Sequence, residues 1–203
     1  MLLNWQKGRH IMKNILILNG SPRAHGNTAA LVDAFSRGAQ EAGNTVHICN
    51  LRTMNIHPCI GCLQGGKTYD SPCVQKDDMD QIYTLYRSAD CIVYASPLYW
   101  WSFSAQLKAA IDRLFAAMEG SSDNGAPAYQ TNLTAKECIM IVPAEEDHAA
   151  NFELINHYFD GYLQRMGWKD AGRLLAGGLM QAKDIQNRPE YLSKAYELGR
   201  SIR

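Results

Sequence analysis

The stretch Lys13-Asn-Ile-Leu-Ile-Leu-Asn-Gly-Ser-Pro-Arg-Ala-His-Gly-Asn-Thr28 joins an apolar run to the start of a helical pattern. The run at 15–18 predicts a buried strand that stops at Gly20, and the helix is expected to begin near Asn27. A strand that feeds a helix through a short polar loop brings unpaired backbone N–H groups together, and the helix dipole favours negative charge there. The stretch therefore predicts an anion site that suits phosphate.

Side chains in this loop strengthen the prediction. Ser21, Asn27 and Thr28 can each add a hydrogen bond to a phosphate oxygen. Arg23 is the one fixed cation in the loop, and its planar guanidinium can grip a phosphate with two parallel N–H donors. We therefore expect the domain to be built around a phosphorylated cofactor.

Composition limits the other possibilities. The chain has 203 residues, with 20 Lys and Arg against 20 Asp and Glu, so no overall field recruits nucleic acid or an anionic membrane. No apolar run predicts a membrane span, and the N-terminus does not resemble a signal peptide. We expect a cytoplasmic protein whose six cysteines are thiols or ligands. Residues 1–11 fit no element and are interpreted as an N-terminal extension before a single domain, 12–203.

Strand and helix patterns alternate along the rest of the chain. The sequence predicts strands at 15–18, 45–51, 91–95, 137–142 and 168–175, and helices at 28–42, 79–86, 102–118, 149–166 and 189–202. Such alternation is typical of a parallel sheet with helices on both faces. Because ligands of such sheets bind beyond the carboxyl ends of the strands, the important loops follow Leu18, Ala95 and Val142.

The loop motifs distinguish between kinds of phosphate. The chain has no Gly-x-x-x-x-Gly-Lys-Ser/Thr run, and its first loop has no Gly-x-Gly-x-x-Gly, so nucleoside triphosphates and ordinary dinucleotide binding are disfavoured. A terminal monophosphate such as that of FMN suits the first loop better. Ser96-Pro-Leu-Tyr-Trp-Trp101 follows the third strand, and its aromatic rings can line a flat heteroaromatic ring. The alternative is that these rings only pack on the next helix.

Five motifs then occur in a fixed order. They are Asn-Gly-Ser-Pro-Arg-x-x-Gly-Asn-Thr at 19–28, Cys-x-x-Cys at 59–62, Cys-Val-x-Lys-Asp-Asp-Met at 73–79, Ser-Pro-Leu-Tyr-Trp at 96–100 and Ala-Gln-Leu-Lys-Ala-x-Ile-Asp-Arg at 105–113. Together they resemble the flavodoxin-like NAD(P)H-dependent FMN reductases, and in particular the branch related to iron–sulfur flavoproteins. Motifs carry the resemblance over residues 13–115, and the order of elements carries it over the remainder.

The resemblance implies a flavodoxin-like three-layer α/β sandwich, with a five-stranded parallel sheet of order 2-1-3-4-5 and helices on both faces. It implies that FMN binds through two loops, a phosphate loop and a loop against the isoalloxazine ring, whose residues are Ser21, Arg23, Gly26, Asn27 and Thr28, and Pro97, Leu98, Tyr99 and Trp100. A third flavin loop falls on 144–147 and includes Ala144 and Glu145. Negative charge disfavours the anionic reduced ring, so we expect carboxylates in that loop to face solvent or to cap the next helix.

The cysteines match the family only in part. Iron–sulfur flavoproteins hold a [4Fe–4S] cluster through four closely spaced cysteines; Cys59, Cys62 and Cys73 match three positions, whereas Gly65 occupies the other. Because a cubane needs four thiolates, the favoured interpretation is a loop without metal whose thiols pack or lie exposed. An incomplete cluster, a zinc site completed by His57, and a redox dithiol of Cys59 and Cys62 stay open as alternatives.

The expected function is an oxidoreductase that passes hydride from NAD(P)H through FMN to a quinone, a flavin, an aromatic compound or a redox protein. Because the flavin supplies the chemistry, no catalytic side chain is expected. The resemblance also implies a homodimer or homotetramer. The alternatives are a flavodoxin-like electron carrier that never meets nicotinamide, an iron–sulfur flavoprotein relative and a cofactor-free binding protein. Carriers of that kind are strongly acidic, so the balanced charge of this chain favours the reductase.

Overall fold

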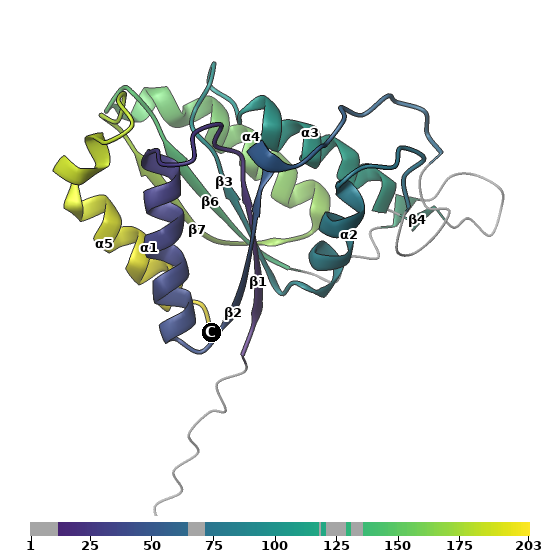
Figure 1. The fold of residues 1–203 in the computed structure, drawn as a ribbon, viewed down its shortest axis with the longest axis horizontal. Helices are drawn as coiled ribbons and strands as arrows, with labels where there is room; N and C mark the ends of the chain where they lie inside the picture. Colours follow the sequence, from purple (N-terminus) through teal and green to yellow (C-terminus); the bar gives the residue numbers. More distant parts are fainter. Residues whose placement is uncertain (1–11, 65–71, 118, 121–128, 131–135) are drawn as a thin grey trace, which may run out of the picture.

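Five parallel strands form the central sheet in the order β2-β1-β3-β6-β7 (Figure 1). The computed structural model describes residues 12–64, 72–117, 119–120, 129–130 and 136–203. The strands of the sheet are β1 (Asn14–Asn19), β2 (Thr45–Asn50), β3 (Cys91–Ala95), β6 (Glu137–Pro143) and β7 (Lys169–Ala176). Counted along the chain this order is 2-1-3-4-5, so the predicted topology is confirmed. The extension at 1–11 lies outside the described residues, and the domain boundary at 12 stays a prediction.

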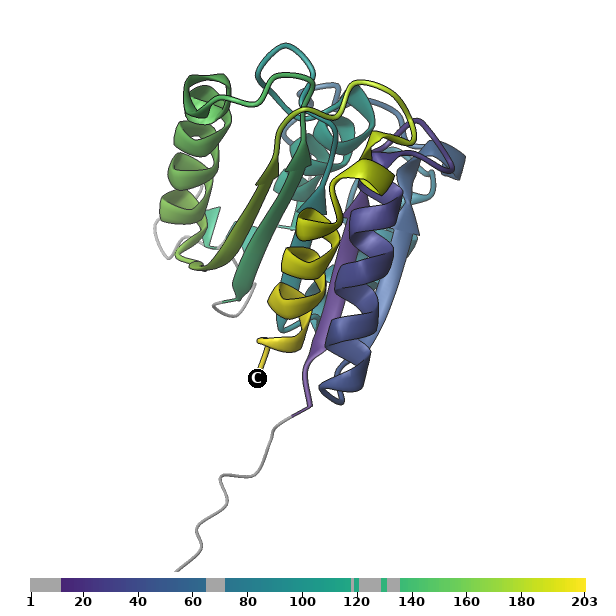
Figure 2. The same cartoon turned by 90° about the vertical axis from the view of Figure 1, so that its left-hand side faces the viewer.

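Helices cover both faces of the sheet. Figure 2 shows α1 (Asn27–Glu41) and α5 (Pro189–Arg200) side by side on one face. The other face carries α2 (Met79–Ser88), α3 (Ala105–Arg113) and α4 (Glu153–Met166). A pair of two-residue antiparallel strands, β4 (Glu119–Gly120) and β5 (Tyr129–Gln130), lies between α3 and β6 in the chain. Within the described part of the chain, none of the helices has the length and apolar character that crossing a bilayer requires.

The sheet is buried on both faces, which explains the unbroken apolar run of β1. Ile15 and Ile17 pack with α1 and α5, whereas Leu16 and Leu18 pack with the helices of the opposite face. Parallel strands that are covered on both sides are apolar throughout rather than alternating. The apolar run therefore predicts a central strand, and β1 lies between β2 and β3.

Two helices begin later than their periodicity predicts. Helix α3 starts at Ala105 because Ser104 is its N-cap, where the Ser104 hydroxyl accepts a hydrogen bond from Leu107 N at 3.4 Å. The same hydroxyl donates to the carbonyl of Gly20 at 2.6 Å, so this cap also joins α3 to the loop after β1. A turn of 3-10 helix, Ala149–Phe152, precedes α4. The first residues of both helices are therefore set by local structure that the apolar pattern does not predict.

Helices α1 and α5 approach each other through two glycines. A Cβ atom added at Gly38 would lie 2.0 Å from the carbonyl oxygen of Tyr196, and one added at Gly199 would lie 2.0 Å from that of Phe35. Both positions therefore require the absence of a side chain. This close contact fixes α5 against the helix whose N-terminus borders the candidate site.

Gly38→Ala is expected to lower the free energy of unfolding by about 1–3 kcal/mol, because the added methyl group forces the two helix backbones apart. The matched control is Gly161→Ala in α4, where an added Cβ meets nothing within 4 Å. There the gain in helix propensity should raise stability by about 0.5–1 kcal/mol. Urea unfolding of both variants measures the difference, and equal effects would contradict the proposed close contact.

Candidate functional site

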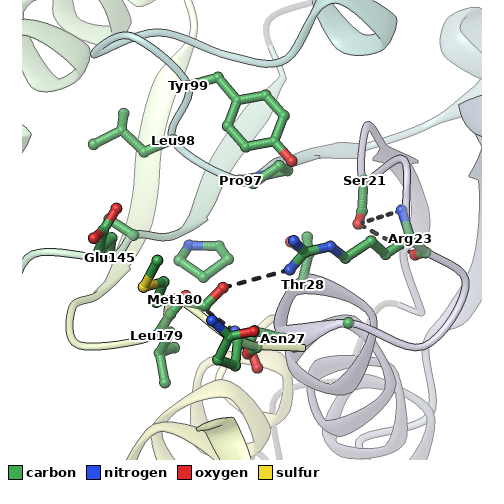
Figure 3. A pocket seen from close by; sticks show the side chains of 14 residues that line it. Ser21, Arg23, Asn27, Thr28, Pro97, Leu98, Tyr99, Glu145, Leu179 and Met180 are labelled. Atoms are coloured by element: carbon green, nitrogen blue, oxygen red, sulfur yellow. Dashed lines mark hydrogen bonds between the residues drawn. The ribbon is translucent and has the colours of Figure 1, made fainter. Parts of the chain in front are cut away.

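A pocket of about 300 Å³ lies at the carboxyl ends of β1, β3, β6 and β7 (Figure 3). The chain runs from β1 to β2 on one side and then crosses from β2 to β3 on the other side of β1, so this edge includes the point where the strand order reverses. The lining consists of Ser21, Arg23, Gly26, Asn27, Thr28, Pro97, Leu98, Tyr99, Pro143, Ala144, Glu145, Leu179, Met180 and Gln181. Every residue predicted to contact the cofactor is in this lining except Trp100.

The loop after β1 is held in a tight turn. Gly20 donates its N–H to the carbonyl of Ala95 at 2.8 Å, which ties the loop to the end of β3. The Ser21 hydroxyl accepts from Arg23 N at 3.2 Å and is buried. The Arg23 side chain is exposed, and its one hydrogen bond within the described residues is a long contact of 3.5 Å with the carbonyl of Met180. Figure 3 shows its guanidinium extending into the pocket, where it is available to an anion.

The N-terminus of α1 opens into the same pocket without a side-chain cap. Gly26 is the N-cap residue, and the first turn of the helix contains no acidic side chain. The first hydrogen bond of the helix runs from Ala30 N to the carbonyl of Gly26, at 3.2 Å. The N–H groups of residues 27–29 have no acceptor among the described residues. Free N–H groups, the helix dipole and Arg23 together make a site that fits a phosphate group.

Asn27 has a structural contact that the sequence does not predict. Its amide nitrogen donates to the carbonyls of Leu179 and Gln181, at 3.1 and 2.8 Å, and its amide oxygen accepts from Ile185 N at 3.2 Å. The side chain predicted to bond phosphate therefore holds the segment after β7 against α1. Asn27 can still offer its backbone N–H to a ligand.

The segment 179–181 is the part of the site that sequence analysis missed. Leu179 is buried, whereas Met180 and Gln181 are exposed at the mouth of the pocket. The hydrogen bonds of Leu179 N to the carbonyl of Ala144 and of Gly178 N to that of Glu145 attach this segment to the third loop. No motif marks these residues; the signal available in the sequence was their position after the last strand of the sheet.

The loop after β3 forms the opposite wall. Leu98 donates its N–H to the carbonyl of Pro143 at 2.9 Å, which joins the second loop to the third. Figure 3 shows Leu98 and Tyr99 across the pocket from Leu179 and Asn27. The Tyr99 ring is 43% exposed and can therefore cover a planar group placed in the pocket.

Trp100 lies elsewhere than predicted. Tyr99 and Ser102 exchange backbone hydrogen bonds of 2.9 and 3.0 Å around a two-residue turn. Both central residues have positive φ, 50° at Trp100 and 55° at Trp101, as a type I′ turn requires. This backbone turns Trp100 out of the pocket lining, and its side chain is 89% exposed. Trp100 lines an adjoining hollow instead, and its predicted contact with the isoalloxazine ring stays a prediction.

The third loop has carboxylates at the edge of the pocket and in solvent, and Glu145 lines the pocket. Ala144 is buried, whereas Glu145 and Glu146 are exposed. Asp147 forms an ion pair of 3.0 Å with Arg188, and hydrogen bonds to Glu190 and Asp147 raise the pKa of that arginine. Of the two expected placements, Glu145 and Glu146 show exposure to solvent, whereas the N-cap of the following turn is His148, whose Nδ1 accepts from Asn151 N at 3.2 Å.

The three family-matching cysteines border a separate apolar cavity of about 570 Å³ between their loop, α3 and α4. Cys59 is exposed, Cys62 is half-buried and Cys73 is buried. Within the residues that the structure describes, no three His, Cys, Asp or Glu side chains come together in an arrangement that could hold a metal ion. The assignment of these cysteines stays a prediction.

A buried ion pair holds both ends of this cysteine loop. Arg113 Nη1 lies 2.7 Å from Asp77 Oδ2 and also donates to the carbonyl of His57 at 2.9 Å. The Asp77 carboxylate accepts from the backbone N–H groups of His57 and Met79, at 2.9 and 3.1 Å. Burial alone would raise the pKa of Asp77, but these bonds and Arg113 outweigh it and hold the pKa below its ordinary value. The cysteine loop is thus anchored by an ion pair that the spacing of these residues in the sequence does not predict.

Comparison with known proteins agrees with this architecture. The sequence model of the flavodoxin-like fold family matches residues 13–198. An iron–sulfur flavoprotein of Archaeoglobus fulgidus is 37% identical over 103 residues, which are 51% of this chain and 46% of that protein. An FMN-dependent NADH:quinone oxidoreductase of Aeromonas salmonicida is 26% identical over 184 residues, covering 86% of this chain and 92% of that protein.

Among solved structures, an NAD(P)H:quinone oxidoreductase from Methanothermobacter marburgensis superposes with a TM-score of 0.72 at 19% identity, covering 94% of this chain and 96% of that one. The identity is too low to carry more than the fold. The chain belongs to the flavodoxin-like fold family. Its alignment spans about half the length of the iron–sulfur flavoprotein, at 46%.

Proposed function

We propose that the protein is an FMN-dependent oxidoreductase that takes hydride from NAD(P)H and delivers electrons to a small-molecule acceptor or a redox protein. The observation that carries the proposal is the uncapped N-terminus of α1, which opens into a pocket together with the exposed guanidinium of Arg23. A site of this kind fits a phosphate ester attached to a flat ring. The quinone reductase relative, aligned over most of both chains, supports FMN and a nicotinamide cofactor.

Different residues of the pocket would contact the phosphate and the ring of FMN. The N–H groups of residues 27–29, the Ser21 hydroxyl and Arg23 would hold the phosphate. Leu98 and Tyr99 would lie against the ring on one side of the pocket, and the 179–181 segment would border it on the other. FMN, when bound, supplies the redox chemistry of the reaction. The protein contributes affinity, orientation and a polar surrounding for the ring.

The overall reaction balances without a catalytic side chain. Reduction of a quinone consumes one NAD(P)H and one solvent proton and yields NAD(P)⁺ and the hydroquinone. The homodimer or homotetramer and the cytoplasmic location stay predictions.

Anaerobic mixing of the flavin-loaded protein with NADH or NADPH tests the proposal. We expect bleaching of the flavin absorbance within seconds with at least one of the two nucleotides, followed by reoxidation when a quinone is added. If neither nucleotide bleaches the flavin while dithionite does, the protein is an electron carrier of the flavodoxin type instead.

Iron and zinc assays on the same anaerobic sample test the cysteine loop. A stoichiometric amount of either metal would contradict the interpretation of this loop as one without metal.

A further inference from the structure

A second hollow adjoins the candidate cofactor pocket. Its volume is about 200 Å³, and its lining consists of Leu98, Trp100, Trp101, Ala144, Glu145, Glu146 and Asn151. Leu98, Ala144 and Glu145 also line the cofactor pocket, so the two spaces share a wall. A molecule in the hollow would therefore lie next to whatever fills the pocket.

The hollow has an aromatic side. Trp100 and Trp101 lie edge to face, with ring centroids 6.0 Å apart. The positive φ angles of their turn hold Trp100 almost fully exposed, so its ring surface is available to a ligand. Aromatic side chains in this state bind planar rings by stacking.

Hydrogen-bond acceptors face the same space. Asn151 is only 8% exposed, and no described residue donates a hydrogen bond to its side-chain oxygen. Its amide nitrogen is used in a contact of 3.4 Å with the carbonyl of Glu146. The oxygen is not among the fully buried atoms without a partner, so a molecule in the hollow can reach it. Asn151 can therefore accept a hydrogen bond from an N–H or O–H group of a ligand in this hollow.

The charge of the hollow is negative. Among the described residues that line it, Glu145 and Glu146 are the charged ones. The Glu146 carboxylate lies 2.7 Å from His148 Nε2, whereas that of Glu145 has no donor within the described chain. An anionic ligand would meet repulsion that no lining cation offsets.

We propose that this hollow binds the ring of the electron acceptor, and that it selects planar aromatic acceptors that are neutral or cationic and carry an amino or amide donor. Trp100 stacks on the ring, Asn151 accepts from its donor group, and Glu145 repels anionic substituents. The proposal rests on the proposed function, since it places the acceptor beside the FMN pocket.

Calorimetric titration of the oxidised, FMN-loaded protein tests the selection without turnover. The probes are 2-amino-1,4-naphthoquinone, 1,4-naphthoquinone and 1,4-naphthoquinone-2-sulfonate, which share one ring system. We expect affinity to fall in that order, with about a tenfold gap or more between the first and the last, and the gap should narrow at high salt. Equal affinities for the three probes would overturn the proposal.

Three variants assign the effect to residues. Glu145→Gln should tighten binding of the sulfonate about three- to tenfold and leave the parent quinone unchanged. Asn151→Leu should remove the advantage of the amino compound, and Trp100→Leu should weaken all three probes by about two- to tenfold. Glu197→Gln, an exposed change on α5 outside the lining, is the control and should alter none of them.

The outcomes separate the two proposals. If FMN binds and NAD(P)H reduces it, but the three variants bind the probes as the parent protein does, the hollow is not the acceptor site and the reductase function stands. If the protein does not bind FMN, both proposals fail. Thermal melting of Asn151→Leu is measured beside the titration, and a variant that melts early is replaced by Asn151→Ser.

Discussion

Asp77→Asn is expected to lower the free energy of unfolding by about 3–5 kcal/mol, because the change leaves the Arg113 guanidinium buried without its counter-charge. The two side chains are 0% and 1% exposed, respectively. For a domain of this size the loss corresponds to about 6–20 °C in the melting temperature. Urea unfolding and thermal melting measure it. Increased reactivity of Cys73 toward a thiol reagent should accompany it, since the pair anchors the cysteine loop.

Asp112→Asn is the matched control. Asp112 is next to Arg113 in sequence, but its ion pair with Lys108 is exposed and should contribute at most about 0.5 kcal/mol. If both variants lose the same stability, the buried pair does not have the role assigned to it.

The pH dependence of stability gives a second check on the Asp77–Arg113 pair. A carboxyl whose pKa is lower in the folded state stabilises above its unfolded pKa, about 3.9. The deficit of Asp77→Asn should therefore be largest above about pH 5 and shrink as pH falls below 4.

Arg23→Ala is expected to weaken FMN binding about 10- to 100-fold, because it removes a charge-assisted contact with the phosphate. Stability should change by less than about 0.5 kcal/mol, since the arginine is exposed and makes one long contact of 3.5 Å. The FMN affinity of Arg23→Lys should lie between those of the parent protein and of Arg23→Ala, because a lysine keeps the charge and loses the planar fork. Quenching of flavin fluorescence on titration of the apoprotein gives the affinities.

Arg37→Ala is the control for this change. Arg37 is exposed on α1, one of the helices of the site, but is absent from the pocket lining. Its removal should leave FMN affinity unaltered within about twofold. If the Arg23→Ala and Arg37→Ala proteins bind FMN equally tightly, the Arg23 guanidinium does not bind the phosphate.

The parts of the site that follow strands were predictable. Apolar runs buried on both faces predict β1, β3 and β6, and the loops after them must meet at one edge of a parallel sheet. The residue types of the first loop then indicate phosphate, and the structure brings Ser21, Arg23 and the start of α1 together in one pocket. The residue types of the loops and the topology of the sheet were enough to predict this part of the pocket.

The remaining features depend on tertiary contacts or contradict local preference. The side chain of Asn27 is used by the 179–185 segment, about 150 residues away, which no local pattern reveals. The Asp77–Arg113 pair joins residues 36 apart in sequence. A type I′ turn normally has Asn or Gly at its centre, so the tryptophans at 100 and 101 gave no turn signal. The sequence therefore did not predict that Trp100 lies in the hollow beside the pocket, and its contact with the flavin ring stays a prediction.

The central claim is that a phosphate ester is held at the start of α1. Calorimetric titration of the apoprotein with FMN and with riboflavin, which share the ring and differ by the phosphate, tests it most directly. We predict that FMN binds about 100-fold more tightly or better, because the free N–H groups of residues 27–29 and Arg23 act on the phosphate alone. Equal affinities for FMN and riboflavin would contradict the claim.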